Sequence, residues 1–192
     1  EEIKQSIKTA QLVLRLLLDR KKASDELSLI AQDKNSFLLR LMRGQYGSEK
    51  WAAERANTYG ITLAIPRCAV AVQADLSPFE NKSPMELAQI QQNVNRTIRD
   101  VFAGQEDLIY EYATGETVVL TSSDSVRDPA RRSSIAERAI SRLYSELKQQ
   151  YSVPVLIGVG EECADHTEIP QSINQARSAM EIGSRTESPD GI

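Results

Sequence analysis

The sequence predicts an α+β domain with a split βαβ arrangement, preceded by an N-terminal helical segment. Apolar residues have helical spacing from Glu1 to about residue 44, and short runs rich in β-branched residues alternate with helical patterns after that point. The order after residue 60 is strand, helix, strand, strand, helix, strand, helix. Ferredoxin-like and palm-type domains have this order, with the first and third strands side by side at the centre of the sheet.

The N-terminal helical segment carries a narrow apolar seam. Apolar residues recur at alternating spacings of four and three at Ile3, Ile7, Ala10, Leu14 and Leu17. The seam breaks at the mostly charged residues 19–26 and restarts out of phase at Leu27 and Ile30. This pattern predicts either two helical segments or one long bent helix. The seam fits two interpretations, an amphipathic helix packed on its own domain and a self-associating linker helix, and the second predicts a homodimer.

A turn separates this helical segment from the rest of the chain. Gly44 and Gly47 are turn residues, and Ser48 is placed to cap a short helix that ends near Gly60. We therefore expect two parts: residues 1–45 as a helical linker with possible dimerisation helices, and residues 46–192 as an α/β domain.

The elements of the α/β domain follow local signals. Cys68–Val72 is a short apolar run typical of a buried strand, and Ser83, Pro84 and Glu86 form a capping box for a helix to about Phe102. The remaining predictions are strands at 108–110 and 118–120 joined as a hairpin, a helix starting at Asp128-Pro129, a strand at 153–159, and a helix from about Pro170 to Gly183.

Composition and charge exclude several classes of protein. The chain has 23 Lys and Arg against 27 Asp and Glu, a net charge of −4, which argues against a basic nucleic-acid surface. No apolar run approaches the roughly 18 residues that a membrane span needs. The two cysteines have no metal-binding or redox-motif spacing, and no targeting segment is present. We expect reduced thiols and a cytoplasmic location.

Two carboxylates are the candidates for ligand chemistry. Asp75 follows the first predicted strand and Glu116 begins the third, so the predicted sheet brings them to one edge. Carboxylates in this position could hold Mg²⁺ on a nucleoside triphosphate. However, Ala113 and Thr114 stand where a phosphate-binding turn requires glycines. The sequence therefore favours two solvated loop carboxylates, with no metal, no cofactor and no catalytic residue.

Two further patterns carry no predicted chemistry. His166 is the only histidine and lies in a polar loop, which favours a surface position over a catalytic one. Gly158-Val159-Gly160 follows a strand as a dinucleotide-binding motif would. Glu161 and Glu162 come next, and their negative charge would repel a pyrophosphate.

Three segments together resemble the carbohydrate diacid regulators and the wider PucR-like group of bacterial transcription regulators. Residues 54–67 resemble the entry to the middle domain of that family, and residues 169–183 resemble its helix of pattern S-x-x-x-A-x-x-A-x-x-x-G. The helical lead-in at 34–44 is the third segment. The likeness spans nearly the whole chain, with the three segments in the family's order.

The resemblance implies a GGDEF-like middle domain without cyclase activity. Residues 113–117 stand where a diguanylate cyclase carries Gly-Gly-Asp-Glu-Phe, and only Glu116 matches. The implied function is a non-catalytic regulatory relay, in a transcriptional activator of sugar-diacid utilisation. DNA binding belongs by resemblance to a C-terminal helix-turn-helix domain of the parent protein, and effector binding belongs to its N-terminal domain. The alternative is a nucleotide-binding or weak cyclase-like domain that uses Asp75 and Glu116 with Mg²⁺.

Overall fold

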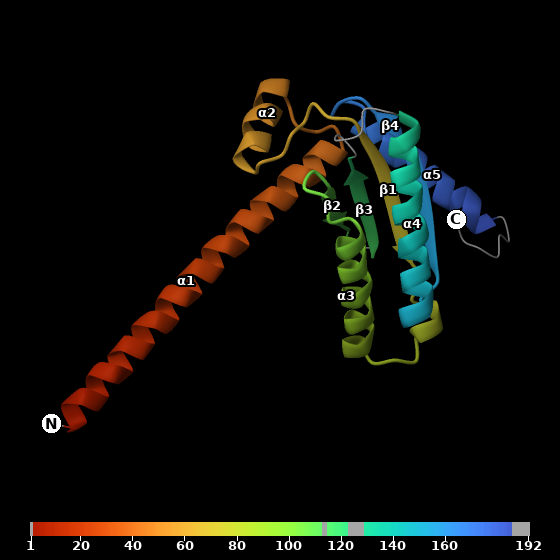
Figure 1. The fold of residues 1–192 in the computed structure, drawn as a ribbon. Helices are drawn as coiled ribbons and strands as arrows, with labels where there is room; N and C mark the ends of the chain where they lie inside the picture. The colour runs from red at the N-terminus through yellow and green to blue at the C-terminus, as the bar shows by residue number, and fades with distance from the viewer. Residues whose placement is uncertain (1, 113–114, 123–128, 186–192) are drawn as a thin grey trace. The chain divides into compact units, whose positions relative to one another are not determined.

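The computed structural model describes residues 2–112, 115–122 and 129–185, with the side chains of 2–13 and 129–135 left out (Figure 1). It confirms the predicted fold class and order of elements. The chain divides into two compact units, Glu1–Phe37 and Leu38–Ile192. This division lies within the first helix, after Phe37. The domain boundary that the sequence predicts, after residue 45, lies just beyond the end of that helix at Met42 and stays a prediction.

The N-terminal segment is one continuous helix, α1 (Glu2–Met42). The charged residues 19–26 do not interrupt it, because Lys, Arg, Ala and Glu are good helix formers where no packing is required. Leu14 and Leu17 of the predicted seam are 61% and 57% exposed, whereas Ile3, Ile7 and Ala10 lie outside the described side chains. The last residues of α1 belong to the second unit, where Leu41 is fully buried.

The short helix α2 (Glu49–Thr58) begins as predicted. The hydroxyl of Ser48 accepts a hydrogen bond of 3.2 Å from the backbone N–H of Trp51. Ala52 and Ala56 are buried on the inner side of the helix. Gly60 follows with a φ of +66°, a conformation that favours glycine and ends the helix.

A four-stranded antiparallel sheet with the order β2-β3-β1-β4 forms the centre of the second unit. Its strands are β1 (Arg67–Ala74), β2 (Leu108–Glu111), β3 (Glu116–Thr121) and β4 (Val155–Cys163). The first and third strands pair at the centre, as predicted, and Val70 lies opposite Val119. β4 runs four residues further than the sequence predicts. Its added residues pair with the start of β1, where Arg67 lies opposite Cys163.

Helices cover both faces of the sheet (Figure 1). On one face α3 (Pro84–Val101) and α4 (Pro129–Tyr151) pack on Val70, Val72 and Val119. The predicted capping box is present, because Ser83 accepts from Glu86 and the Glu86 carboxylate accepts from the Ser83 N–H at 2.8 Å. A short 3₁₀ turn, Ser77–Phe79, connects β1 to this layer. No helix of the described segments is long and apolar enough to span a membrane.

The other face is covered by α5 (Ile169–Arg185), which lies unusually close to β4. A Cβ atom added at Gly158 would lie 1.9 Å from the carbonyl oxygen of Ala176, and one at Gly160 would lie 2.0 Å from that of Ser172. The two glycines of the Gly158-Val159-Gly160 pattern therefore serve helix packing. Ser172 completes the contact, since its hydroxyl accepts from the Ala69 N–H at 3.1 Å and donates to the Glu161 carbonyl at 2.7 Å.

This close packing predicts a strong position dependence for glycine replacement. Gly158→Ala should lower the free energy of unfolding by at least about 2 kcal/mol, because α5 must move to accommodate the methyl group. Gly183→Ala, in α5 itself, is the control, because a Cβ atom added at Gly183 would meet no atom within 4 Å. It should raise stability by about 0.5–1 kcal/mol through helix propensity. Urea denaturation measures both, and equal effects of the two substitutions would contradict the packing.

Candidate functional site

The hairpin between β2 and β3 is the centre of the candidate site. Glu116 begins β3, and Arg177 reaches it from α5. The guanidinium Nε lies 2.7 Å from Oε1 of Glu116 and its second nitrogen lies 3.3 Å from Oε2. The pair is therefore bidentate, with the side chains 15% and 36% exposed for Glu116 and Arg177 respectively. Both oxygens of the predicted metal ligand accept hydrogen bonds from a cation of the protein itself.

An aromatic pair adds to this contact. The guanidinium carbon of Arg177 lies 5.0 Å from the ring centroid of Tyr112, a cation–π distance. The rings of Tyr110 and Tyr112 meet edge to face at 4.8 Å. Burial alone would lower the pKa of Arg177, but the hydrogen bonds and the charge of Glu116, with a smaller contribution from Tyr112, outweigh it and raise the pKa. Arg177 therefore stays charged at this position.

The helix α3 holds the hairpin from the other face of the sheet. Asn95 donates to Glu111 of β2 at 2.8 Å and accepts from Thr117 of β3 at 3.5 Å. Gln91 donates to Asn95 at 2.9 Å, and Arg99 forms an ion pair with Glu111. The hairpin is thus fixed by α3 on one face and by α5 on the other.

Asp75, the second predicted ligand, is bound in a local turn. Gln73 lies opposite Glu116 in the register of β1 and β3, so Asp75 and Glu116 lie at the same end of the sheet. The Asp75 carboxylate is exposed and accepts a hydrogen bond of 2.9 Å from the Ser77 N–H. Within the segments that the structure describes, no three His, Cys, Asp or Glu side chains are grouped so as to hold a metal ion.

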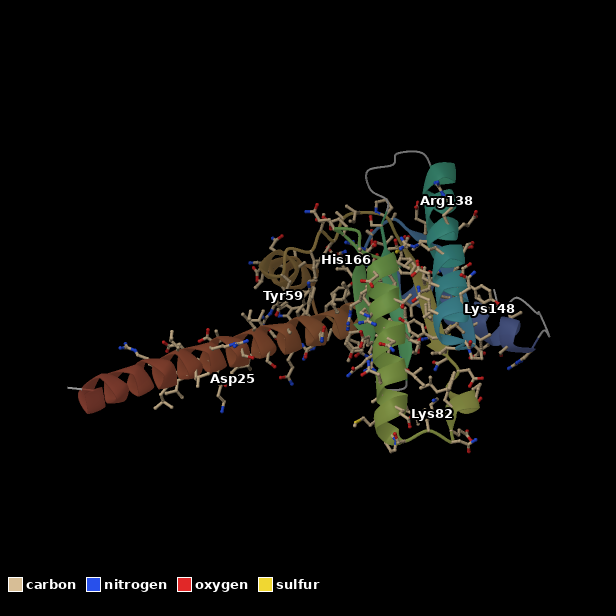
Figure 2. All side chains as sticks on the ribbon, turned by 60° about the horizontal axis from the view of Figure 1, so that its bottom comes forward. Asp25, Tyr59, Lys82, Arg138, Lys148 and His166 are labelled. Atoms are coloured by element: carbon tan, nitrogen blue, oxygen red, sulfur yellow. The ribbon has the colours of Figure 1, made fainter. Side chains whose placement is uncertain are left out.

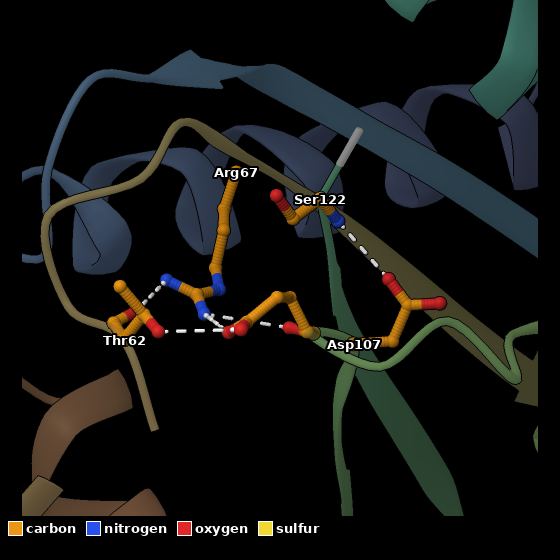
Figure 3. Close-up of polar contacts among 5 residues, drawn as sticks. Thr62, Arg67, Asp107 and Ser122 are labelled. Carbon is orange, nitrogen blue, oxygen red and sulfur yellow. Dashed lines mark hydrogen bonds and ion pairs between the residues drawn. The ribbon is translucent and has the colours of Figure 1, made fainter. Parts of the chain in front are cut away.

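A second polar centre was not predicted from the sequence. Arg67 at the start of β1 is only 1% exposed, and it donates to the Thr62 carbonyl at 2.7 Å (Figure 3). It also forms an ion pair of 3.5 Å with Glu106, whose carboxylate accepts from the Thr62 hydroxyl. Beside it, Asp107 accepts from the Ser122 N–H at 3.0 Å. Arginine is mostly exposed in proteins, so its place before an apolar run is the only feature of the sequence that points to this burial.

His166 lies in the loop between β4 and α5, with its ring half-buried (Figure 2). Its ring centroid is 5.3 Å from that of Tyr46. Nε2 of the ring is buried and has no hydrogen-bond partner among the described residues, so the described contact of His166 is its packing with Tyr46.

Comparison of the sequence with known protein families identifies the family of this chain. Residues 43–182 match the family described as the GGDEF-like domain. The chain belongs to this family. Its match covers the short helix α2, the whole sheet and most of α5, and therefore includes the hairpin with Glu116 and the helix that carries Arg177. No match was found among curated proteins.

Solved structures of GGDEF domains have the same fold. A microbial GGDEF domain described with cyclic di-GMP has 15% identity and a TM-score of 0.53, with 78% of this chain and 86% of that chain covered. The diguanylate cyclase SiaD of Pseudomonas aeruginosa, in complex with its activator SiaC, has 15% identity and a TM-score of 0.53, with 96% and 75% covered. The GGDEF domain of PA1120 from the same organism has 17% identity and a TM-score of 0.51, with 72% and 84% covered. At these identities the likeness establishes the fold alone.

The two cysteines of this GGDEF-like domain are free thiols on neighbouring strands. Cys68 donates to the Gly160 carbonyl and Cys163 donates to the Arg67 carbonyl, each at 3.1 Å. Burial raises the pKa of Cys68 to about 11, with smaller contributions from Cys163 and Glu162. Burial also raises the pKa of Cys163. A raised pKa leaves little thiolate, so neither thiol suits nucleophilic chemistry near neutral pH.

The thiol pKa predicts slow alkylation. At pH 8 a thiol with a pKa of about 11 is about one-thousandth thiolate, against about one-tenth for a thiol at the unshifted value of 9.0. Iodoacetamide should therefore modify Cys68 of the folded chain about a hundredfold more slowly than it modifies an exposed cysteine with the unshifted pKa of 9.0. The rate should rise about tenfold per pH unit between pH 8 and 10. Mass spectrometry follows the reaction, and modification at the rate of the exposed cysteine would contradict the burial.

The Arg177–Glu116 pair predicts a measurable coupling. A double-mutant cycle of Arg177→Met and Glu116→Gln should give about 1 kcal/mol of interaction free energy, because the pair is bidentate and only partly exposed. The i,i+4 pair Arg142–Glu146 of α4, with one hydrogen bond and an arginine that is 61% exposed, is the control and should give about 0.3–0.5 kcal/mol. Urea denaturation of the two cycles measures this difference. Equal couplings would show that the Arg177 contact contributes no more than a surface pair.

Proposed function

We propose that this GGDEF-like domain is a non-catalytic regulatory relay. The observation that carries the proposal is the bidentate pairing of Glu116 with Arg177. A divalent cation needs carboxylate oxygens with free lone pairs that face the metal. Here a guanidinium from α5 occupies one lone pair of each oxygen. A metal ion at Glu116 would have to use the remaining lone pairs and would be repelled by the positive charge of Arg177.

The hairpin turn supports the same proposal. Residues 113–117 of this chain keep only the glutamate of the Gly-Gly-Asp-Glu-Phe sequence. Its single glycine, Gly115, has a φ of +84° and lies beside the side chains of Gln73 and Gln91. The hydrogen bonds of Asn95 to both hairpin strands hold this arrangement in place.

The regulatory context comes from the resemblance to the carbohydrate diacid regulators. The parent protein would bind a sugar diacid through one domain and DNA through a helix-turn-helix domain, while this chain connects the two. The proposal includes a homodimer formed through α1, whose Leu14 and Leu17 are more than half exposed. The net charge of −4 supports the placement of DNA contacts outside this chain.

Calorimetric titration with GTP and ATP, each with and without Mg²⁺, tests the proposal. We expect no binding at micromolar affinity under any condition, because neither carboxylate is arranged for a metal-bound triphosphate. Binding that requires Mg²⁺ would instead support the alternative, a nucleotide-binding or weak cyclase-like domain that uses Asp75 and Glu116.

Two variants make this test specific. Glu116→Ala should abolish any Mg²⁺-dependent binding if the alternative is correct, and it should change nothing if the relay is correct. Arg177→Met frees the Glu116 carboxylate, so a gain of weak Mg²⁺ binding in this variant alone would show that the ion pair itself blocks the metal. Mg²⁺ binding by the unmodified chain would contradict the proposal.

A further inference from the structure

Residues 61–66, which we call the strap, connect α2 to β1 outside any helix or strand. Among the described residues, only Ile61 of the strap takes part in a backbone–backbone hydrogen bond, donating to the Ala56 carbonyl of α2 at 2.9 Å. Ile61 and Ile65 are buried, with 5% and 7% exposed. Segments with few backbone hydrogen bonds open at a lower free energy than the strands of a sheet. The strap is therefore held to the sheet by side chains.

A buried arginine joins the strap to the loop before β2 (Figure 3). Arg67 is 1% exposed, and its guanidinium donates to the Thr62 carbonyl at 2.7 Å. It also meets Glu106, through an ion pair of 3.5 Å with the carboxylate and a hydrogen bond of 3.4 Å to the carbonyl. The Glu106 carboxylate in turn accepts from the Thr62 hydroxyl at 3.2 Å. Thr62 is thus held through two of its oxygens.

The two residues that hold Thr62 are fixed without the strap. Arg67 belongs to β1, within the paired sheet. Glu106 precedes Asp107, whose carboxylate accepts from the Ser122 N–H directly after β3 at 3.0 Å. Neither of these contacts involves the strap, so both can persist when Thr62 moves. The arrangement therefore has one fixed half, in the sheet and its loop, and one movable half.

The buried charge lowers the cost of lifting the strap. The Arg67 guanidinium has lost its hydration, and a carboxylate that is itself 32% exposed offsets this loss only in part. Lifting the strap exposes the guanidinium to water at the place of the Thr62 carbonyl, so hydration replaces the broken hydrogen bond. Burial of Ile61 and Ile65 acts in the other direction and favours a closed strap.

We propose that the strap opens and closes as one segment while the sheet stays folded, and that Thr62 leaves Arg67 and Glu106 in the open state. The strap connects α2 to β1, so its opening loosens the attachment of α2 to the sheet. This inference deepens the proposed relay, and its regulatory meaning rests on that proposal, because a relay requires two defined states.

Thiol labelling of the full chain tests the opening. Ile65→Cys places a buried thiol in the strap, and Ile98→Cys, at a residue of α3 that is 1% exposed, is the matched control in the core. Mass spectrometry of digested chains separates these labels from those on Cys68 and Cys163. We expect the strap thiol to react at least about tenfold faster than the core thiol, and at least about tenfold slower than an exposed thiol.

Urea distinguishes the two routes of exposure. In 1 M urea the Ile98→Cys thiol should react about tenfold faster, because it becomes accessible only when the whole core unfolds. The Ile65→Cys thiol should change by less than about twofold, because opening of the strap exposes little surface. Equal urea dependence of the two thiols, or reaction of Ile65→Cys at the rate of an exposed thiol, would overturn the proposal.

Two carboxylates of nearly equal exposure test whether the Arg67 contacts hold the strap. Glu106→Gln should speed labelling of the Ile65→Cys chain about tenfold, because the closed state then leaves a buried cation without its carboxylate. Thr62→Val, which removes only the hydroxyl, should act in the same direction with a smaller factor. Glu111→Gln is the control, since Glu111 is 33% exposed and its ion pair lies outside the strap. It should leave Ile65→Cys within twofold while it speeds Ile98→Cys.

The same variants can contradict the proposal. If Glu111→Gln speeds both thiols equally, the strap opens only when the sheet unfolds. If neither Glu106→Gln nor Thr62→Val speeds labelling of Ile65→Cys, these contacts do not hold the strap. Either result rejects the inference. Labelling is measured without nucleotide, so an opening strap together with Mg²⁺-dependent nucleotide binding would retain the opening and reject the non-catalytic relay.

Discussion

The close approach of α5 to β4 is the constraint on which the rest of the second unit depends. Gly158 and Gly160 allow the backbone of Ala176 and Ser172 to come into direct contact with the strand. Arg177 is the next residue after Ala176, so the same packing carries its guanidinium to the carboxylate of Glu116. A larger residue in β4 would move the helix and the ion pair together. The ion pair at the hairpin therefore depends on the same packing of α5 on β4 that stabilises the fold.

The sequence predicted the fold well because its signals are local. The capping box at Ser83, the turn at Gly60 and the apolar run of β1 each identify an element without knowledge of the rest of the chain. The sequence also left open whether the N-terminal segment is one helix or two. Exposed charged residues prolong a helix as readily as they interrupt a seam, so the pattern alone could not decide between these possibilities.

The site was less accessible to sequence reasoning, because its contacts join distant segments. Asp75 and Glu116 could be placed at one end of the sheet from the order of the strands. The pairing of Glu116 with Arg177 spans 61 residues and depends on how closely α5 packs. The burial of Arg67 likewise depends on Thr62 and Glu106, which come together only in the fold. The sequence argued against a nucleotide motif at the glycines of β4, and only their close contacts with the backbone of α5 give them another role.

In this GGDEF-like domain the hairpin glutamate is paired with a cation of the same chain, and the proposed relay builds on that pairing. The hydrogen bond of Asn95 to Glu111 and the contact of the Tyr112 ring with Arg177 hold the hairpin. In α1, Leu14 and Leu17 are more than half exposed, and the proposed homodimer would use this surface.

The most direct measurement of the central claim is nuclear magnetic resonance of the Arg177 side chain in the full chain. The Nε–H proton should exchange slowly with water and show a coupling across its hydrogen bond to the Glu116 carboxylate, and both should persist when Mg²⁺ and GTP are added. Fast exchange, or loss of the coupling on addition of Mg²⁺ and GTP, would show that Glu116 is available to a metal-bound nucleotide and would contradict the account.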